Sequence, residues 1–213
     1  MATPVIVLGV LTYNRFGLLK QTMSSLVGTI PATDIVLIDG GSTDPAQLAY
    51  VRSWNGECLQ IPTVGESMEI VIEHCLRRKA DIVVFSADDY QYRSDWQQRL
   101  MWFWHRAPAD VALASLNWEP DYPWNGVEAI ERLGDETVLY RKTLPGSSWS
   151  FRAVDWPQIG PIAHKTGGED FDICQRLRAN GKRLAALNLT EHIGERNSAW
   201  GNQSWTIAKP LSI

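Results

Sequence analysis

Stretches of apolar residues alternate with amphipathic stretches through the first half of the chain. Continuous apolar runs predict buried strands over 5–11, 35–38, 81–85 and 111–116, with a weaker strand over 58–61. Apolar residues at helical spacing predict helices over 15–26, 45–54, 67–79 and 94–106, the last with a capping box of Ser94 and Gln97. Strands and helices in this order form a parallel sheet covered on both faces, so the sequence predicts an α/β fold.

The regular alternation stops between Asn117 and about Gly168, where prolines, glycines and aromatic residues dominate. Short strand-like runs lie within this stretch, over 137–140 and 148–154. Helical spacing returns over 169–180, Gly181 ends that helix, and a last strand is predicted over 183–187. No internal repeat and no Gly/Ser-rich linker divides the chain, so we expect residues 1–213 to form one domain.

Composition narrows the classes of protein to consider. The chain has 213 residues, three of them cysteine, and a formal net charge of −4, which argues against nucleic-acid binding. The cysteines are too far apart for a disulfide framework or a metal knuckle, which favours a reducing compartment. No apolar run reaches the roughly 18 residues of a membrane span, and the N-terminus lacks a signal peptide's basic start. We therefore expect a cytoplasmic protein without a membrane span.

Two adjacent carboxylates, Asp88 and Asp89, come shortly after the strand predicted over 81–85. The carboxyl ends of parallel strands form the edge at which α/β sheets bind their ligands. Carboxylates at that edge either hold a hard cation against a phosphate or only solvate a turn. The residues themselves leave both interpretations open.

The turns after the first two strands are also polar. Residues 12–15 lack phosphate-cradling glycines, so contacts to a base or ribose suit them better than contacts to a pyrophosphate. Capping of the next helix by Thr12 or Asn14 is the alternative. Asp39 in the second turn can accept a hydrogen bond from a nucleobase or a ribose hydroxyl. Residues 39–44 are equally ordinary turn chemistry, with Asp44 as a helix cap.

The helix predicted over 169–180 begins with three acidic residues, Glu169, Asp170 and Asp172, after two glycines. The helix dipole favours acidic first turns, but three carboxylates exceed what capping needs, so one of them is a candidate general base. His192 lies in a polar loop after the last predicted strand. Most lone histidines are not ligands, but near Asp88 this imidazole is a candidate ligand for Mn²⁺.

Taken together, four segments resemble the motifs of the family 2 glycosyltransferases, which have the GT-A fold. Residues 12–15 are similar to the family's T-Y-N-R, and residues 38–44 to its D-x-G-S-T-D. Residues 86–89 stand in the place of its D-x-D-D, with Ser86 where an aspartate is usual, and residues 168–170 are similar to its G-E-D. The order and spacing agree over roughly residues 5–195.

The resemblance implies the transfer of one sugar, with inversion, from a UDP-sugar to a glycan hydroxyl, with Mn²⁺ or Mg²⁺ as cofactor. Residues 1–116 would bind the nucleotide sugar, and residues 117–213 would carry the acceptor site and the base. The implied donor-binding residues are Thr12, Tyr13, Arg15, Asp39, Gly65, Ser86, Ala87 and Asp88. The implied metal ligands are Asp88 and His192, the implied base is Asp170, and the implied acceptor pocket contains Trp118, Trp149 and Glu169, with Trp124 as a further candidate.

The chain has neither the Q-x-x-R-W motif nor the membrane helices of processive synthases, so single-sugar addition is expected. A looser resemblance is to the glycosyltransferase domains that decorate viral capsid glycans. That type implies UDP-L-rhamnose or UDP-glucose as donor, and a longer multidomain chain. Two other functions remain open: a sugar-nucleotide or glycan-binding module without turnover, and a glycoside hydrolase that uses Asp88 and Asp170. The enzymatic interpretation requires Asp88 and Asp170 to converge on one cleft.

Overall fold

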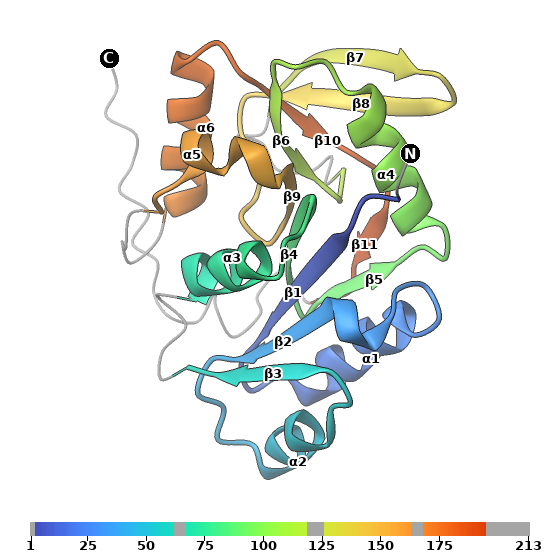
Figure 1. The fold of residues 1–213 in the computed structure, drawn as a ribbon, viewed down its shortest axis with the longest axis vertical. Coiled ribbons are helices and arrows are strands. Elements are labelled where there is room, and N and C mark those ends of the chain that lie inside the picture. Colours follow the sequence, from blue (N-terminus) through green and yellow to red (C-terminus); the bar gives the residue numbers. More distant parts are fainter. Residues whose placement is uncertain (1–2, 62–66, 119–125, 163–167, 195–213) are drawn as a thin grey trace.

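The computed structural model describes residues 3–61, 67–118, 126–162 and 168–194. These residues form a mixed α/β structure around a sheet with the strand order β3-β2-β1-β4-β9-β6-β10-β8-β7, and a second sheet pairs β11 with β5 (Figure 1). The strands are β1 Ile6–Thr12, β2 Ile35–Asp39, β3 Glu57–Gln60, β4 Ile82–Ala87, β5 Tyr90–Tyr92, β6 Val111–Ser115, β7 Val127–Leu133, β8 Glu136–Arg141, β9 Ser148–Arg152, β10 Arg183–Ala186 and β11 Thr190–His192. The helices are α1 Phe16–Leu26, α2 Pro45–Ser53, α3 Ser67–Arg77, α4 Trp96–Arg106, α5 Trp156–Ile159 and α6 Glu169–Ala179. The predicted α/β fold is confirmed.

The first half of the chain builds the parallel part of the sheet. β1 pairs in parallel with both β2 and β4, and β2 pairs in parallel with β3. Every residue of β1 and β2 is buried, as expected for strands that are covered on both faces. Figure 1 shows α2 beyond β3 at one end of the molecule and the β7–β8 hairpin at the opposite end.

Helix α3 packs across β1, β2 and β4. The apolar stripe that the sequence predicts for this helix is buried at Val71, Ile72 and Cys75. The close approach depends on Gly9 in β1, because a Cβ at that position would lie 2.1 Å from Val71 Cγ1. Because Gly9 has no side chain, α3 can lie this close to the centre of the sheet.

The second half of the chain departs from the sequence prediction. β9 runs antiparallel to both β4 and β6 and lies between them. The predicted irregular stretch also contains β7, which forms a hairpin with β8 around Gly134. A register shift between Val127 and Ala129 interrupts the period-two pattern of β7, and Ile130 is 67% exposed. An irregular, solvent-facing edge strand leaves no alternating pattern to recognise.

Two of the helix ends predicted from the sequence are present in the structure, and one is not. Asp44 caps α2 by accepting a hydrogen bond from the Ala46 N–H at 2.9 Å, and Gly181 follows α6 with a φ of 71°, both as predicted. The capping box of Ser94 and Gln97 does not form. α4 begins at Trp96, whose N–H bonds to the Arg93 carbonyl at 3.2 Å, so the tight turn moves the start of the helix past Ser94.

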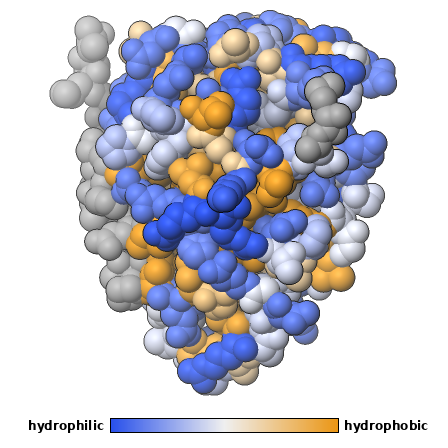
Figure 2. Space-filling view, in the orientation of Figure 1, coloured by the Kyte–Doolittle hydropathy of each residue, from blue (hydrophilic) through white to orange (hydrophobic). Residues whose placement is uncertain are grey.

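Hydrophilic residues predominate on the face shown in Figure 2, and the cysteines, all within the described residues, form no disulfide. Figure 2 shows hydrophilic residues over much of one face, with hydrophobic residues in smaller groups among them. The three cysteines, Cys58, Cys75 and Cys174, are free thiols. Within the described ranges, no helix combines the length and the apolar character that a membrane span requires.

Candidate active site

The carboxyl ends of β1, β2 and β4 meet at one edge of the sheet. In the parallel register Thr12 is opposite Asp39, and Leu11 is opposite Ala87, which directly precedes Asp88. The predicted polar segments after these three strands are therefore neighbours. This edge is where open α/β sheets bind ligands.

Gln47 of α2 joins the polar ends of β1 and β2. Its amide nitrogen lies 3.0 Å from Thr12 Oγ1, 3.2 Å from Asp39 Oδ1 and 2.6 Å from Ser42 Oγ, and its side chain has no exposed surface. Its amide oxygen accepts a hydrogen bond from the Arg15 N–H at 2.7 Å. Sequence reasoning did not single out Gln47, because a glutamine inside a helix is ordinary and only the folded structure shows that it is buried.

Asn14 connects the turn after β1 to the turn after β2. Its Oδ1 accepts hydrogen bonds from the N–H groups of Thr43 at 2.8 Å and Asp44 at 3.1 Å. Its own N–H donates to Ser42 Oγ at 2.9 Å. Its backbone adopts a φ of 50°, a left-handed conformation that asparagine tolerates better than most residues. Asn14 thus holds the two turns together by hydrogen bonds. It does not cap α1, whose N-cap residue is Arg15 and has no side-chain cap hydrogen bond.

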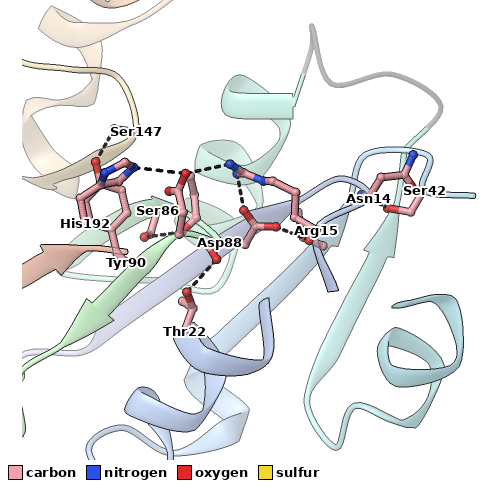
Figure 3. A network of polar contacts seen from close by, with 12 residues as sticks. Asn14, Arg15, Thr22, Ser42, Ser86, Asp88, Tyr90, Ser147 and His192 are labelled. Carbon is pink, nitrogen blue, oxygen red and sulfur yellow. Dashed lines mark hydrogen bonds and ion pairs between the residues drawn. The ribbon is translucent and has the colours of Figure 1, made fainter. Parts of the chain in front are cut away.

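Arg15 places its guanidinium between the two carboxylates that follow β4. It donates to Asp88 Oδ1 through Nη2 and to Asp89 Oδ2 through Nη1, the latter at 2.8 Å (Figure 3). Thr12 Oγ1 donates to the other oxygen of Asp88 at 2.5 Å. Both Asp88 oxygens are therefore bonded within the protein, and this side chain has no exposed surface. By contrast, Asp89 Oδ1 is buried and has no hydrogen-bond partner among the described residues.

His192 approaches the same carboxylates from the far end of the chain. It is carried by β11, which pairs antiparallel with β5 so that His192 is opposite Tyr90. Its Nε2 lies 3.4 Å from Asp89 Oδ2, and its ring lies 5.3 Å from the Tyr90 ring. The predicted neighbourhood of His192 and the carboxylates after β4 is present, with Asp89 as the carboxylate that His192 approaches.

The two carboxylates differ electrostatically. Burial raises the pKa of Asp88 to about 6, although the charge of Arg15 and the hydrogen bonds from Thr12 and Arg15 act in the opposite direction. Burial also acts to raise the pKa of Asp89, but the interactions with His192 and Arg15 outweigh it and hold that pKa below its ordinary value. Asp89 is thus ionised over a wider pH range than Asp88.

Asp170 lies in the first turn of α6, after Gly168, whose φ of 86° places it in the left-handed region. Asp170 Oδ2 accepts a hydrogen bond from the Gly146 N–H at 3.1 Å, and Oδ1 accepts one from the Phe171 N–H at 2.8 Å. Burial raises the pKa of Asp170, and these two N–H groups act in the opposite direction. Its neighbour in the same turn, Asp172, instead forms an ion pair with Arg176 at 3.4 Å.

A short segment joins Asp170 to the end of β4. Next to Gly146, the Ser147 carbonyl accepts a hydrogen bond from the Ala87 N–H at 2.7 Å. Ser147 Oγ and the Tyr90 hydroxyl share a hydrogen bond at 2.5 Å, and Figure 3 shows Ser147 beside Tyr90 and His192. Asp88, which follows Ala87, and Asp170 are therefore connected through two consecutive residues of the chain, 146 and 147.

The other expected site residues occupy varied positions. Ser86 is fully buried in β4, where its Oγ bonds to the Ala87 carbonyl at 2.9 Å, and Tyr13 is half-buried. Trp149 lies in the core rather than at a sugar-binding surface, because β9 runs through the middle of the sheet and leaves the ring 0% exposed. Trp118 is partly exposed, and Glu169 is half-buried in the first turn of α6. Gly65 and Trp124 lie outside the described residues.

The side chains of Asp89 and His192 provide some, but not all, of the ligands that a divalent metal needs. No group of three or more His, Cys, Asp and Glu side chains forms a ready-made metal site within the described part of the chain. Asp89 and His192 nevertheless provide a carboxylate with an unpartnered oxygen and a neighbouring imidazole. One carboxylate and one imidazole, completed by phosphate oxygens of a substrate, suit Mn²⁺.

The fold places this chain among proteins with the GT-A glycosyltransferase fold, as the resemblance implied. The structure of GalNAc-T7 with UDP, GalNAc and Mn²⁺ matches with a TM-score of 0.68 and 13% identity, over 90% of this chain and 44% of that chain. The mannosyltransferase PcManGT from Pyrobaculum calidifontis, in complex with GDP-Man and Mn²⁺, matches with a TM-score of 0.62 and 16% identity, over 92% of this chain and 59% of that chain. The chain thus spans about half the length of these proteins. No protein-family model and no curated protein matches the sequence.

Proposed function

We propose that the protein is a metal-dependent, inverting glycosyltransferase that moves one sugar from a UDP-sugar to a hydroxyl group of a glycan. The observation that carries this proposal is the series of contacts from Asp170 through Gly146 and Ser147 to Ala87 and Asp88. It brings a candidate base close to the sheet edge at which a nucleotide would bind. The GT-A fold, found in solved structures with UDP or GDP-Man, supports the same function.

The nucleoside would contact the polar ends of β1 and β2. Asp39 already accepts hydrogen bonds from Gln47 and from the Ser42 N–H. A carboxylate oxygen has two lone pairs, so each can accept a further hydrogen bond from a uracil N–H or a ribose hydroxyl. The other residues proposed to contact the donor are Tyr13, Arg15 and Ala87. Thr12 and Asp88 have no exposed surface and would support this set from within the protein. UDP-L-rhamnose and UDP-glucose are the first donors to test.

Asp89 and His192 would hold the metal. We propose Asp89, and not Asp88, as the direct carboxylate ligand, because Asp89 Oδ1 has no hydrogen-bond partner among the described residues whereas both Asp88 oxygens are bonded. Asp88 would then orient Arg15 and Thr12 beside the metal. When bound, Mn²⁺ supplies charge that stabilises the departing nucleoside diphosphate.

Asp170 would remove the proton from the acceptor hydroxyl as the hydroxyl oxygen attacks the anomeric carbon. Its raised pKa makes the carboxylate a better proton acceptor than an exposed aspartate. The N–H groups of Gly146 and Phe171 fix the orientation of its two oxygens. A well-placed base contributes about 10²–10⁴-fold to the rate of such a step. Trp118 and Glu169 would contact the acceptor sugar.

A donor screen tests the proposal. Release of the nucleoside diphosphate would be measured with Mn²⁺, as UDP from UDP-glucose, UDP-L-rhamnose, UDP-galactose and UDP-GlcNAc and as GDP from GDP-mannose. Each donor would be tested with and without oligosaccharide acceptors. A glycosyltransferase releases UDP from at least one donor, faster with an acceptor and not with EDTA. Calorimetric UDP binding without release would instead identify a binding module. Cleavage of nitrophenyl glycosides without a nucleotide would identify a hydrolase, and either result would overturn the proposal.

A further inference from the structure

The segment from Leu144 to Ser148 is bonded to α6 on one side and to the end of β4 on the other. On the α6 side, the Leu144 N–H donates to Cys174 Sγ at 3.3 Å, and the Gly146 N–H donates to Asp170 Oδ2 at 3.1 Å. On the β4 side, the Ser147 carbonyl accepts from the Ala87 N–H at 2.7 Å. Adjacent residues of one segment thus hold two elements that are far apart in sequence.

Gly146 is suited to this place because it has no side chain. A Cβ at position 146 would lie 3.0 Å from Asp170 Cβ and 3.5 Å from Asp170 Oδ2, so a side chain there requires Asp170 or the segment to shift by a few tenths of an ångström. The φ of Gly146 is not in the left-handed region, so an alanine there meets no backbone penalty. The requirement for glycine comes from contact with Asp170.

The same segment also holds Tyr90, whose ring lies beside the proposed metal ligand His192. Ser147 Oγ and the Tyr90 hydroxyl lie 2.5 Å apart, and the Tyr90 ring packs against the ring of His192. Gly146 therefore contacts the proposed base while Ser147 contacts the donor side. A shift of about 1 Å between a catalytic group and its substrate can cost about 100-fold in rate, so such a connection has consequences for catalysis.

We propose that Gly146 and Ser147 are positioning residues that set the place of the Asp170 carboxylate relative to the Asp88–Asp89 edge. This inference rests on the proposed function, in which Asp170 is the base. Gly146 acts through its N–H and through its missing side chain, and Ser147 acts through its carbonyl and hydroxyl. Neither residue needs to touch the substrate.

The electrostatic surroundings of Asp170 make the role of Gly146 measurable. Glu169 and Cys174, both on α6, interact electrostatically with Asp170, and the segment 144–148 contains no charged side chain. The Gly146 N–H stabilises the ionised carboxylate and so lowers its pKa. Weakening that hydrogen bond raises the pKa of Asp170 and moves the acidic limb of the rate profile to higher pH.

Two experiments test the inference. The first follows the Gly146 amide of the wild-type protein by NMR between pH 3 and pH 7. We expect its chemical shift to titrate with the Asp170 carboxyl, and the titration to disappear in Asp170→Asn. An amide that does not titrate would refute the contact, and this measurement needs no active enzyme.

The second experiment measures UDP release with Mn²⁺ from the donor that is turned over fastest in the panel above. For Gly146→Ala we expect kcat to fall at least about tenfold, with the donor KM changed less than about twofold and the acidic limb at least about 0.5 pH unit higher. Ser147→Ala, which loses only the hydroxyl, should lower kcat by less. Gly126→Ala is the matched control, because its added Cβ would meet only Lys142 Cδ, at 3.9 Å.

The variant Gly146→Ala/Asp170→Asn separates the two proposals. If Gly146 acts through Asp170, the alanine adds no further loss in the Asp170→Asn background. Wild-type kcat and an unchanged pH profile in Gly146→Ala, while Asp170→Asn is inactive, would refute the positioning role and leave the proposed function intact. Full activity of Asp170→Asn would instead refute the proposed base. Calorimetry with UDP and Mn²⁺ confirms that each variant is folded.

Discussion

The hydroxyl group of Thr12 donates a hydrogen bond to Asp88 Oδ2 at 2.5 Å and so joins the ends of β1 and β4. The same oxygen of Thr12 accepts a hydrogen bond from the Gln47 amide, which leaves its proton directed at the carboxylate. Asp88 is completely buried and shares a single guanidinium with Asp89. Burial raises the pKa of Asp88 to about 6, and the negative charge of Asp89 acts in the same direction.

The raised pKa of Asp88 predicts a pH-dependent stability. Between the ordinary pKa of 3.8 and about 6, the folded protein binds this proton more tightly than the unfolded chain does. The free energy of unfolding should therefore fall as the pH rises through that range. Relative to Asp88→Asn, the wild-type protein should lose roughly 2 kcal/mol between pH 4 and pH 7, measured by urea unfolding with EDTA present. Asp135→Asn, at an exposed position, is the control, and a pH-independent difference would contradict the prediction.

Asp170→Asn should separate binding from catalysis. Asparagine keeps the size of the side chain and one of its two acceptor oxygens but cannot accept a proton in the reaction. We expect UDP affinity in the presence of Mn²⁺ to stay within about threefold and transfer to fall at least ~100-fold. Asp172→Asn, in the same helical turn but paired with Arg176, should keep transfer within about threefold. The reverse ranking would make Asp172 the base.

His192→Ala should weaken UDP binding only when Mn²⁺ is present. Loss of the imidazole removes one of the two proposed metal ligands, so we expect a drop of about tenfold or more in Mn²⁺-linked affinity, measured by calorimetry. With EDTA the affinities of the variant and the wild type should agree. His105→Ala, at an exposed position of α4, should change neither value. Equal affinities with Mn²⁺ would remove His192 from the metal site.

Gly9→Ala should destabilise the fold although alanine is the better residue for a strand. The added Cβ would lie 2.1 Å from Val71 Cγ1, and either the Val71 side chain or α3 must shift to relieve that overlap. We expect a loss of about 2–3 kcal/mol in urea unfolding. Combining it with Val71→Ala should recover part of the loss, because the two changes act on one contact. Gly17→Ala, with no atom within 4 Å of its added Cβ, should be neutral or slightly stabilising.

Sequence patterns predicted the parallel half of the fold well because its central strands, β1, β2 and β4, are buried along nearly their whole length. β1, β2 and β4 read as apolar runs, and the buried residues of α3 recur at helical spacing. β7 gave no such signal, since its register shift breaks the alternation. β5 and β11 have only three residues each, and their pairing depends on chain segments about 100 residues apart, which no local pattern records.

The candidate site was predictable in outline and not in detail. The spacing of polar turns indicated which segments would meet, because the carboxyl ends of parallel strands share one edge. The partners within that edge depend on side-chain directions, so neither the placement of Arg15 between Asp88 and Asp89 nor the burial of Gln47 was foreseen. The expected pocket position of Trp149 is wrong because an aromatic residue between serines looks the same in sequence whether it packs inward or outward.

The position of β9 decides whether the chain could be cut into independently folding pieces. A fragment that ended after β6 would lack the strand that bridges β4 and β6, and both would present unpaired backbone groups along their length. Because β9 follows residue 116 in the chain, residues 1–116 alone lack the strand that joins β4 to β6. Translation must therefore pass Arg152 before the middle of the molecule can close, and truncated products should aggregate rather than bind nucleotide.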